Sequence, residues 1–258
     1  MSDPFITLEG RVIVVTGAGQ GIGRAVAGWI VALGGRVVAI DMNASELDAF
    51  AETAPEGRVL PCAGSVTDRA FLEDLTLSLR DRFGIVDGLV NNAGITRPAM
   101  IHKMAPEDWQ SVIDVNLTGA FNCLQVFGSQ MIEGLKDETL AQASIVNISS
   151  DAGRRGTIGQ INYGAAKSGV LGLTMSAARE WGRYGMRVNS MCFGVVETPM
   201  TEVARGEKFR DGLIAQIPMN RWATTDEAAK PVCFLLSDAA SYVTGQHLSA
   251  NGGFHIAS

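Results

Sequence analysis

Tyr163 and Lys167 are the two residues whose types and spacing point most directly to proton-transfer chemistry. They stand four positions apart in a run rich in glycine and alanine, so on a helix they share a face. A free phenol has a pKa of about 10 and is a poor acid or base at neutral pH. A nearby ammonium lowers that pKa because it stabilises the phenolate. The pair predicts a tyrosine that exchanges a proton with a substrate oxygen, although the same spacing also occurs on ordinary surface helices.

A buried strand, a glycine turn and a helix near the start of the chain form a second candidate site. Residues 11–16 (RVIVVT) are a β-branched run typical of a strand buried on both faces, and residues 24–33 have the pattern of a helix. Between them, residues 16–23 read TGAGQGIG, and these glycines let the backbone approach a pyrophosphate at a helix N-terminus. The arrangement indicates a dinucleotide site, and a glycine turn without a ligand is the alternative.

Asp41 follows directly on the next predicted strand, residues 36–40. An acidic residue about 20 positions past the glycines accepts hydrogen bonds from the adenine ribose of NAD and repels the extra phosphate of NADP. Neither Gln20 nor Met42 supplies a positive charge for that phosphate. We therefore predict NAD(H) as the cofactor. The alternative role for Asp41 is to cap the following helix, which Asn43 can also do.

Asparagine occurs at two places where an apolar residue would be expected. The predicted strand at residues 86–91 runs into two consecutive asparagines, Asn91 and Asn92, which suggests that they bind main chain or ligand, or form a turn. A long helix is predicted to begin at Pro106, and Asn116 lies in its middle among apolar residues. Because an unpaired buried amide is unfavourable, Asn116 is expected to bond to main chain.

Composition excludes several classes of function. The 258 residues have a net charge of -6 and a pI near 5.1, which disfavours a nucleic-acid partner. Four scattered cysteines without a C-x-x-C pair and three distant histidines indicate neither a disulfide framework nor a metal site. The chain shows no signal peptide and no apolar run long enough for a membrane span. We therefore expect a cytoplasmic protein that binds no metal and no membrane.

Together these motifs resemble the short-chain dehydrogenase/reductase family. The T-G-x-x-x-G-x-G signature begins at Thr16, NNAG occupies residues 91–94, and Ser150 lies thirteen residues before Tyr163 in its Y-x-x-x-K motif. The resemblance extends from residue 8 to residue 253. It implies one Rossmann-type α/β domain over residues 1–258, with a seven-stranded parallel sheet in the order 3-2-1-4-5-6-7 and helices on both faces.

The resemblance also implies the roles of the site residues. Tyr163 would be the acid/base for hydride transfer between a nicotinamide and a carbonyl carbon, and Ser150 would hold the substrate oxygen. Lys167 would bond the nicotinamide ribose, and Asn116 would distort its helix and hold a water in a proton relay. The residues implied to bind the cofactor are Gly17, Gln20, Gly21, Ile22, Gly23, Asp41, Met42, Ser65, Val66, Asn92, Ala93, Gly94, Tyr163, Lys167, Val196 and Thr198.

The substrate side is expected between residues 150 and 216. Residues 192–200 (CFGVVETPM) resemble the family's P-G-x-x-x-T-x-M motif with phenylalanine in place of the usual proline, and residues 195–216 are predicted to form a lid. Arg154 and Arg155 would either hold an anionic substrate group or be solvated charges. The residues expected to contact substrate are Ser150, Arg154, Phe193, Gly194 and Met200.

Within the family, NNAGITR, NLTGAF, GQINYGAAK and VTGQHLSANGG resemble bacterial β-ketoacyl reductases. Those enzymes commonly use NADPH, whereas Asp41 favours NADH. Residues 133–142 (EGLKDETLAQ) also offer little positive charge to an acidic carrier protein. We therefore expect a CoA thioester or a small ketone as substrate. A diol, sugar or cyclic-alcohol dehydrogenase and a non-catalytic NAD(H)-binding protein are the alternatives. The family and the small-residue helix faces imply a homotetramer.

Overall fold

The computed structural model describes residues 6–256, and within them seven strands form one parallel sheet, which confirms the predicted order β3-β2-β1-β4-β5-β6-β7. Each strand pairs in parallel with its neighbours. The sequence order reverses between β1 and β4, and open α/β sheets bind ligands at such a point, beyond the carboxyl ends of the strands. The strands are β1 Val12–Thr16, β2 Arg36–Asp41, β3 Val59–Ala63, β4 Gly88–Asn91, β5 Ala143–Ser150, β6 Met186–Phe193 and β7 His247–Ala250.

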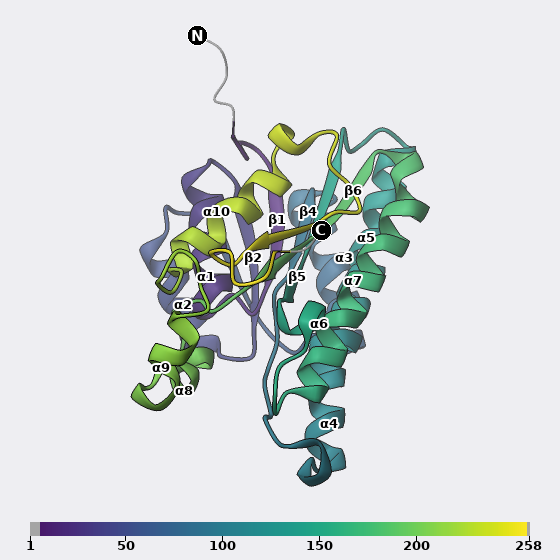
Figure 1. Cartoon of the computed structure of the whole chain (residues 1–258). Coiled ribbons are helices and arrows are strands. Elements are labelled where there is room, and N and C mark those ends of the chain that lie inside the picture. Colours follow the sequence, from purple (N-terminus) through teal and green to yellow (C-terminus); the bar gives the residue numbers. More distant parts are fainter. Residues whose placement is uncertain (1–5, 257–258) are drawn as a thin grey trace.

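Helices cover both faces of the sheet (Figure 1). Helices α1, α2 and α10 pack on one face, and α3, α5 and α7 pack on the other. The helices are α1 Gly21–Ala32, α2 Ala44–Thr53, α3 Arg69–Phe83, α4 Pro106–Ile113, α5 Gly119–Lys136, α6 Ala152–Arg155, α7 Ile161–Trp181, α8 Glu202–Arg205, α9 Glu207–Ile214 and α10 Thr225–Leu236. Short 3-10 helices lie at Ile101–Lys103, Gly182–Tyr184, Pro199–Thr201 and Asp238–Ala240.

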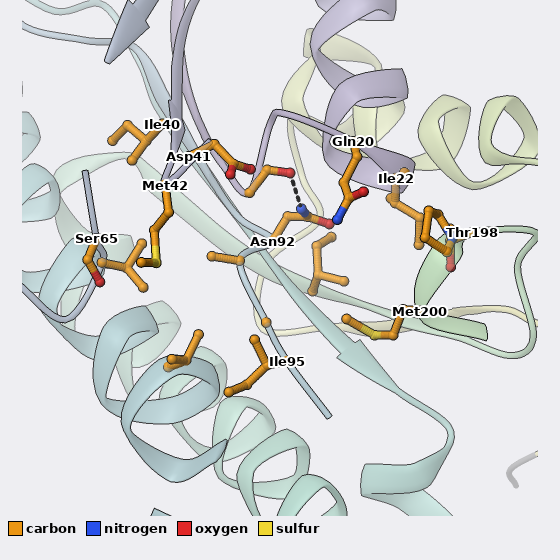
Figure 2. A pocket seen from close by; sticks show the side chains of 18 of the residues that line it. Gln20, Ile22, Ile40, Asp41, Met42, Ser65, Asn92, Ile95, Thr198 and Met200 are labelled. Carbon is orange, nitrogen blue, oxygen red and sulfur yellow. Dashed lines mark hydrogen bonds between the residues drawn. The ribbon is translucent and has the colours of Figure 1, made fainter. Parts of the chain in front are cut away.

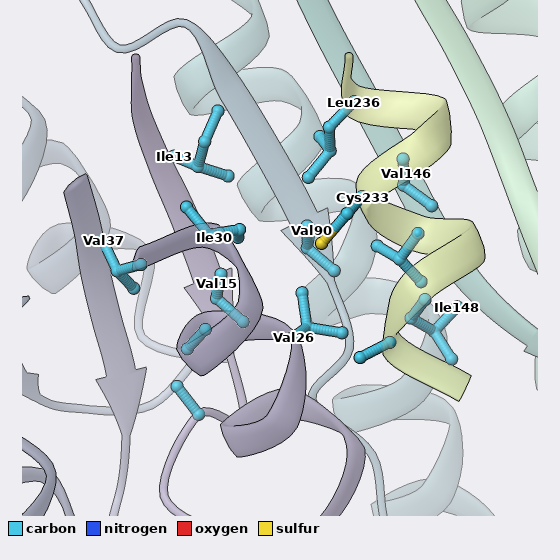
Figure 3. Close-up of a cluster of buried hydrophobic side chains, with 14 of the residues drawn as sticks. Ile13, Val15, Val26, Ile30, Val37, Val90, Val146, Ile148, Cys233 and Leu236 are labelled. Carbon is cyan, nitrogen blue, oxygen red and sulfur yellow. The ribbon is translucent and has the colours of Figure 1, made fainter. Parts of the chain in front are cut away.

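The core on the α1 and α10 face explains why the central strands are apolar. Figure 3 shows Ile13 and Val15 of β1 beside Val26 and Ile30 of α1, with Cys233 of α10 across the same cluster. All five side chains are at most 2% exposed. Burying a Val or Ile side chain contributes about 1.5–3 kcal/mol relative to leaving it exposed. This packing holds the carboxyl ends of β1 and β4 at a fixed distance from α1.

Two features of local structure follow from residue type, and the first of them, the cap by Asn43, was expected from the sequence. The side chain of Asn43 accepts a hydrogen bond from the main-chain N–H of Glu46 and so caps α2. Strand β3, which contains Pro61, lies at an edge of the sheet, where a residue without an N–H is tolerated.

The long helix that begins at Pro106 is interrupted near Asn116, as the family resemblance implied. A π-helix, Asp114–Thr118, separates α4 from α5 and contains Asn116. No helix within residues 6–256 is both long and apolar enough to span a membrane.

Candidate active site

The glycine turn after β1 is held close to the end of β4. The side-chain amide of Asn92 donates to the carbonyl oxygens of Thr16 and Gly17, at 3.0 and 3.1 Å. Gly17 has a φ of +66°, which favours glycine. A Cβ atom on Gly23 would lie 2.1 Å from the Gly17 carbonyl oxygen, so α1 can approach the turn this closely only because residue 23 is glycine. The close packing brings the N-terminus of α1 to the carboxyl edge of the sheet.

The first turn of α1 is suited to an anion. Gln20 at the N-cap position makes no side-chain hydrogen bond to the helix, and the first turn contains no acidic residue. The leading N–H groups of an uncapped helix point outward and carry a partial positive charge. Gly21, the first residue of α1, has a φ of +58°, which favours glycine. A pyrophosphate fits this chemistry, so the residues present match a dinucleotide.

Asp41 lies at the end of β2, beside the glycine turn. Its two carboxylate oxygens accept main-chain hydrogen bonds from Gly19 at 2.9 Å and from Asn43 at 3.0 Å. Met42, the next residue, is 78% exposed. The carboxylate is therefore fixed against the glycine turn, and Asn43, not Asp41, is the residue that caps α2.

A cavity of about 300 Å³ joins the glycine turn to Tyr163 and Lys167. Figure 2 shows the part of its wall that carries Gln20, Asp41 and Met200. Of the described residues that line it, Asp41 and Lys167 carry charge. The predicted cofactor residues on its wall are Gly17, Gln20, Gly21, Ile22, Asp41, Met42, Ser65, Val66, Asn92, Ala93, Gly94, Tyr163, Lys167 and Thr198. Gly23 and Val196 lie outside the wall, and Val196 is only 2% exposed.

The sequence interpretation missed several residues of this wall. Most are direct neighbours of predicted ones along the chain, so extending each motif by one or two positions would have found them. Placing Ile148 on the wall would instead have required the register in which β5 pairs with its neighbouring strands, which the sequence alone did not give. The residues missed are Ile40, Gly64, Ile95, Val115, Ile148 and Pro199.

Lys167 lies on the wall of the cavity and is almost fully buried. Its side chain is 3% exposed, and its ammonium donates to the main-chain carbonyl of Ile148 at 2.8 Å. Its nitrogen lies 5.7 Å from the centroid of the Tyr163 ring. Burial lowers the pKa of Lys167 to about 8. The predicted proximity of the two side chains is confirmed, since both come from one face of α7.

The expected effect of Lys167 on the acidity of Tyr163 is wrong in this structure. Burial raises the pKa of Tyr163 to about 12, and the neighbouring hydroxyl of Ser150 only partly offsets that rise. The physical reason is that Lys167 is itself buried and directs its proton to Ile148, whereas the phenol loses the hydration that would stabilise a phenolate.

The π-helix around Asn116 fits both interpretations of that residue. The Asn116 side chain is 1% exposed and pairs with both main-chain groups of Ile95: its oxygen accepts from the N–H at 2.8 Å and its amide donates to the carbonyl at 3.0 Å. The expected bonds to main chain and the expected helix distortion both occur. Asn116 thereby fixes the segment that follows Gly94, on the cavity wall.

On the substrate side, Ser150 lies at the carboxyl end of β5, and its hydroxyl accepts a hydrogen bond from the N–H of Ala152 at 3.1 Å. Met200 lines the cavity. Phe193 is 4% exposed and packs in the hydrophobic core at the end of β6, so its side chain does not reach the cavity. A Cβ atom on Gly194 would lie 2.9 Å from Asn251, which makes that glycine a site of close packing.

Arg154 and Arg155, considered as anion ligands or solvated charges, both have partners within the chain. Arg154 donates to the hydroxyl of Ser249 at 2.7 Å. The Arg155 guanidinium lies 3.8 Å from the centroid of the Phe254 ring. Neither arginine lines the cavity. Their contacts join α6 to the chain around β7.

The predicted lid segment is helical, and hydrogen bonds join the chain before it to the chain after it. Residues 199–214 form a 3-10 turn and the helices α8 and α9. At the base, the N–H of Glu197 donates to the carbonyl of Ala223 at 2.9 Å, and the N–H of Ala223 donates to the carbonyl of Val195 at 3.2 Å. The segment therefore leaves and rejoins the body of the protein at one place beside Thr198, which is on the cavity wall.

The arrangement can hold an extended ligand with an anionic centre at α1 and a hydroxyl-bearing end at Asp41. At the other end of the cavity, the hydroxyl of Ser150, the phenol of Tyr163 and the ammonium of Lys167 lie where they can exchange a proton with a ligand oxygen. Within residues 6–256, no three His, Cys, Asp or Glu side chains are grouped so as to hold a metal ion.

Comparison with known proteins places this geometry among reductases. A family model described as enoyl-(acyl carrier protein) reductase matches residues 17–255. The 3-oxoacyl-(acyl-carrier-protein) reductase FabG of Thermotoga maritima is 41% identical over 251 residues, which cover 96% of this chain and 99% of that protein. The acetoacetyl-CoA reductase of Synechocystis sp. is 40% identical over 252 residues, covering 96% of this chain and 98% of that protein.

A solved structure shares both fold and sequence with this chain. The crystal structure of levodione reductase superposes with a TM-score of 0.88 at 35% identity, over 95% of this chain and 97% of that one. Sequence and structure comparisons therefore agree over nearly the whole chain.

Proposed function

Because the chain belongs to the short-chain dehydrogenase/reductase family, we propose that it is an NAD(H)-dependent reductase of 3-oxoacyl thioesters, with Tyr163 as its proton donor. Family membership makes it an oxidoreductase that interconverts carbonyl and alcohol groups with a nicotinamide cofactor. The observation that carries the proposal is the single cavity that holds the glycine turn, Asp41, Tyr163 and Lys167 together.

Residues from one end of the cavity to the other would bind the cofactor. The first turn of α1, from Gly21, would bind the pyrophosphate, and Asp41 would accept the hydroxyls of the adenine ribose. Ser65 and Val66 would border the adenine, and Lys167 would donate to the nicotinamide ribose. When bound, the nicotinamide would supply the hydride in reduction or accept it in oxidation. Its oxidised form would also bring a positive charge into the cavity.

The proton transfer belongs to this chain's own side chains. During reduction the phenol of Tyr163 would donate its proton to the carbonyl oxygen of the substrate, and the hydroxyl of Ser150 would donate a hydrogen bond to the same oxygen. Ser150 is suited to this role because its own oxygen is already held by the N–H of Ala152. Holding the donor and the reacting oxygen in one geometry removes much of the entropic barrier of an encounter.

Preference for NAD(H) rests on charge. Asp41 is fixed beside the turn by two main-chain hydrogen bonds, and of the described residues lining the cavity only Lys167, at the opposite end, is positive. A phosphate on the adenine ribose would meet a carboxylate and no cation. Relatives described as 3-oxoacyl reductases do not decide this point, since the preference depends on the residue at position 41.

A CoA thioester is a better candidate substrate than a carrier protein. Residues 133–142 carry three acidic side chains and one lysine, which would repel an acidic carrier. Similarity to an acetoacetyl-CoA reductase at 40% identity supports the same class. Dehydrogenation of a diol, sugar or cyclic alcohol is the alternative, in line with the likeness to levodione reductase.

The deciding experiment follows NADH consumption with acetoacetyl-CoA, beside the same assay with NADPH. Rapid turnover with NADH and little with NADPH is the expected result. If the enzyme turned over only a diol, sugar or cyclic alcohol, that compound class would replace the thioester as the proposed substrate. If it bound NADH but turned over none of these compounds, the proposal that it is an enzyme would be refuted.

A homotetramer is part of the proposal. Large apolar side chains are exposed on the helices of one face: Trp109 on α4, Phe121 on α5 and Met175 on α7 are 37%, 40% and 47% exposed. Such exposed groups are typical of surfaces that associate. Light scattering should give four times the mass of the chain, and a monomeric mass would contradict the assembly.

A further inference from the structure

Asp151, the residue after Ser150, is a buried carboxylate that the proposed reaction does not use. It is 2% exposed, and one of its oxygens accepts from the side-chain amide of Asn251 at 2.8 Å. Its other oxygen is buried and has no hydrogen-bond partner among the described residues. A buried carboxylate with only half of its oxygens paired is unfavourable for stability, so its presence requires another explanation.

Asp151 belongs to a set of three contacts between α6 and the chain around β7. Three residues of one short stretch each bind one residue near 250. We call this set the clasp: Asp151 with Asn251, Arg154 with Ser249, and Arg155 with Phe254. Asn251 is itself fixed, because its amide also donates to the carbonyl of His255 and its oxygen accepts from the N–H of Gly253.

The other side of α6 touches the reacting groups. The N–H of Ala152 donates to the hydroxyl of Ser150, and the N–H of Asp151 donates to the carbonyl of Phe193 at 2.9 Å. A Cβ atom on Gly153 would lie 2.6 Å from the main chain of Lys167, so α6 packs directly on α7 beside that lysine. A shift of α6 therefore moves Ala152, which holds the hydroxyl of Ser150, together with Gly153, which packs against Lys167.

We propose that Asp151 is a positioning residue for the reaction: its buried bond to Asn251 holds α6 against the loop after β7, and α6 in turn holds the hydroxyl of Ser150. This inference rests on the proposed function, in which Ser150 binds the substrate oxygen. Acting through another residue, Asp151 affects the geometry of the carbonyl end of the site and not the cofactor end at Asp41, which lies on a different strand.

The charges around Asp151 determine how the variants respond to pH. Burial raises its pKa, while the amide of Asn251, then His255, Arg155 and Arg154, act against that rise. Cys192 on β6 also faces this group. Asn251→Asp places a second carboxylate against Asp151, and two adjacent carboxylates take up a proton more readily than either alone.

The first experiment compares N251D, D151N and the exchanged pair D151N/N251D in the full chain, with acetoacetyl-CoA and NADH. For N251D we expect kcat at pH 8 to fall by at least about tenfold, because a displacement of about 1 Å at a reacting group can lower rates a hundredfold. Because Asp41 and the glycine turn, which would bind the adenine ribose and the pyrophosphate, are untouched, KM for NADH should change by less than about twofold. The exchanged pair restores one donor and one acceptor, so kcat should return to within about threefold of the unsubstituted chain.

Two further measurements distinguish a positioning role of Asp151 from a contribution to protein stability alone. Lowering the pH toward 6 should raise the kcat of N251D relative to the unsubstituted chain, and D151N, which keeps the acceptor oxygen, should stay within about threefold of it. Asp87→Asn is the matched control. Asp87 accepts the N–H of Val12 at 2.7 Å beside the opposite, amino edge of the sheet, so D87N should lower thermal stability and leave kcat unchanged.

Hydrogen exchange of the peptide 150–156 tests the coupling without turnover. We expect faster exchange in N251D and recovery in the exchanged pair. Unchanged kcat and exchange in N251D would overturn the inference, as would an exchanged pair that regains thermal stability but not kcat. If the unsubstituted chain reduces no substrate, the proposed function fails on its own, and the exchange pattern still decides whether Asn251 holds α6.

Discussion

The ammonium of Lys167 donates its hydrogen bond to the carbonyl oxygen of Ile148, at 2.8 Å, from a side chain that is 3% exposed. Burial lowers the pKa of Lys167 from 10.5 to about 8. Between those two values the unfolded chain holds a proton that the folded chain has released. The free energy of unfolding therefore increases as the pH rises from about 8 to 10.5. Below pH 8 the folded protein must bury the charged ammonium, and the full cost in stability is present.

Lys167→Met should accordingly be more stable than the unsubstituted chain at pH 7, and this advantage should shrink as the pH rises from about 8 to 10.5. The difference over that window should be about 3 kcal/mol, since one unit of pKa corresponds to about 1.4 kcal/mol. Urea unfolding of both chains at several pH values measures it. A difference in stability that does not vary with pH would show that Lys167 is not titrating in the folded protein.

Tyr163→Phe should lose turnover by about a hundredfold to ten-thousandfold, the range for removing one positioned proton donor. The ring and its contacts with the cavity remain, so NADH should bind as before. Fluorescence titration with NADH and the reductase assay give the two halves of this result. A variant that keeps substantial turnover would refute proton donation by Tyr163.

The phenol of Tyr163 should titrate abnormally high without cofactor. Burial raises its pKa to about 12, and the protein contains only three tyrosines, so the difference in phenolate absorbance between the unsubstituted chain and Y163F isolates it. Adding NAD+ brings a positive charge into the cavity and should lower that pKa by at least about one unit. A pKa near 10 without cofactor would mean that the phenol is hydrated.

Asp41→Ser should relax the choice between NADH and NADPH. The substitution removes the carboxylate that faces the adenine ribose and leaves the Asn43 cap of α2 in place. We expect kcat/KM for NADPH to rise about tenfold or more relative to NADH, corresponding to about 1.4 kcal/mol of lost repulsion. An unchanged ratio of the two kcat/KM values would contradict the role assigned to Asp41.

Patterns of neighbouring residues predicted the individual strands, and the family resemblance implied their order in the sheet. Strands such as β1 are buried on both faces and must be apolar throughout, so their sequence is hard to mistake. The Tyr163 and Lys167 pair was visible because four residues make about one helical turn. The position of Asn116 in an apolar helix indicated its main-chain bonds, and the family resemblance implied the distortion that the structure has as a π-helix.

Properties that depend on distant parts of the chain were not predictable in the same way. The pKa of Tyr163 is set by how deeply the folded chain buries it, which no local pattern reveals. Arg154 and Arg155 looked available for an anion because their partners, Ser249 and Phe254, lie almost a hundred residues further on. Phe193 looked like a residue of the substrate loop because the extension of β6 up to it depends on its pairing with β7.

The clasp also has a consequence for how the protein matures on the ribosome. The pairing of β1 with β2 and of β2 with β3 lies within residues 12–63, a stretch that already contains the glycine turn and Asp41. The support of Ser150 through Asn251 exists only after residues 247–256 have been translated. A chain whose synthesis stops before that segment therefore contains the residues of the cofactor half of the cavity but lacks the contacts behind Ser150.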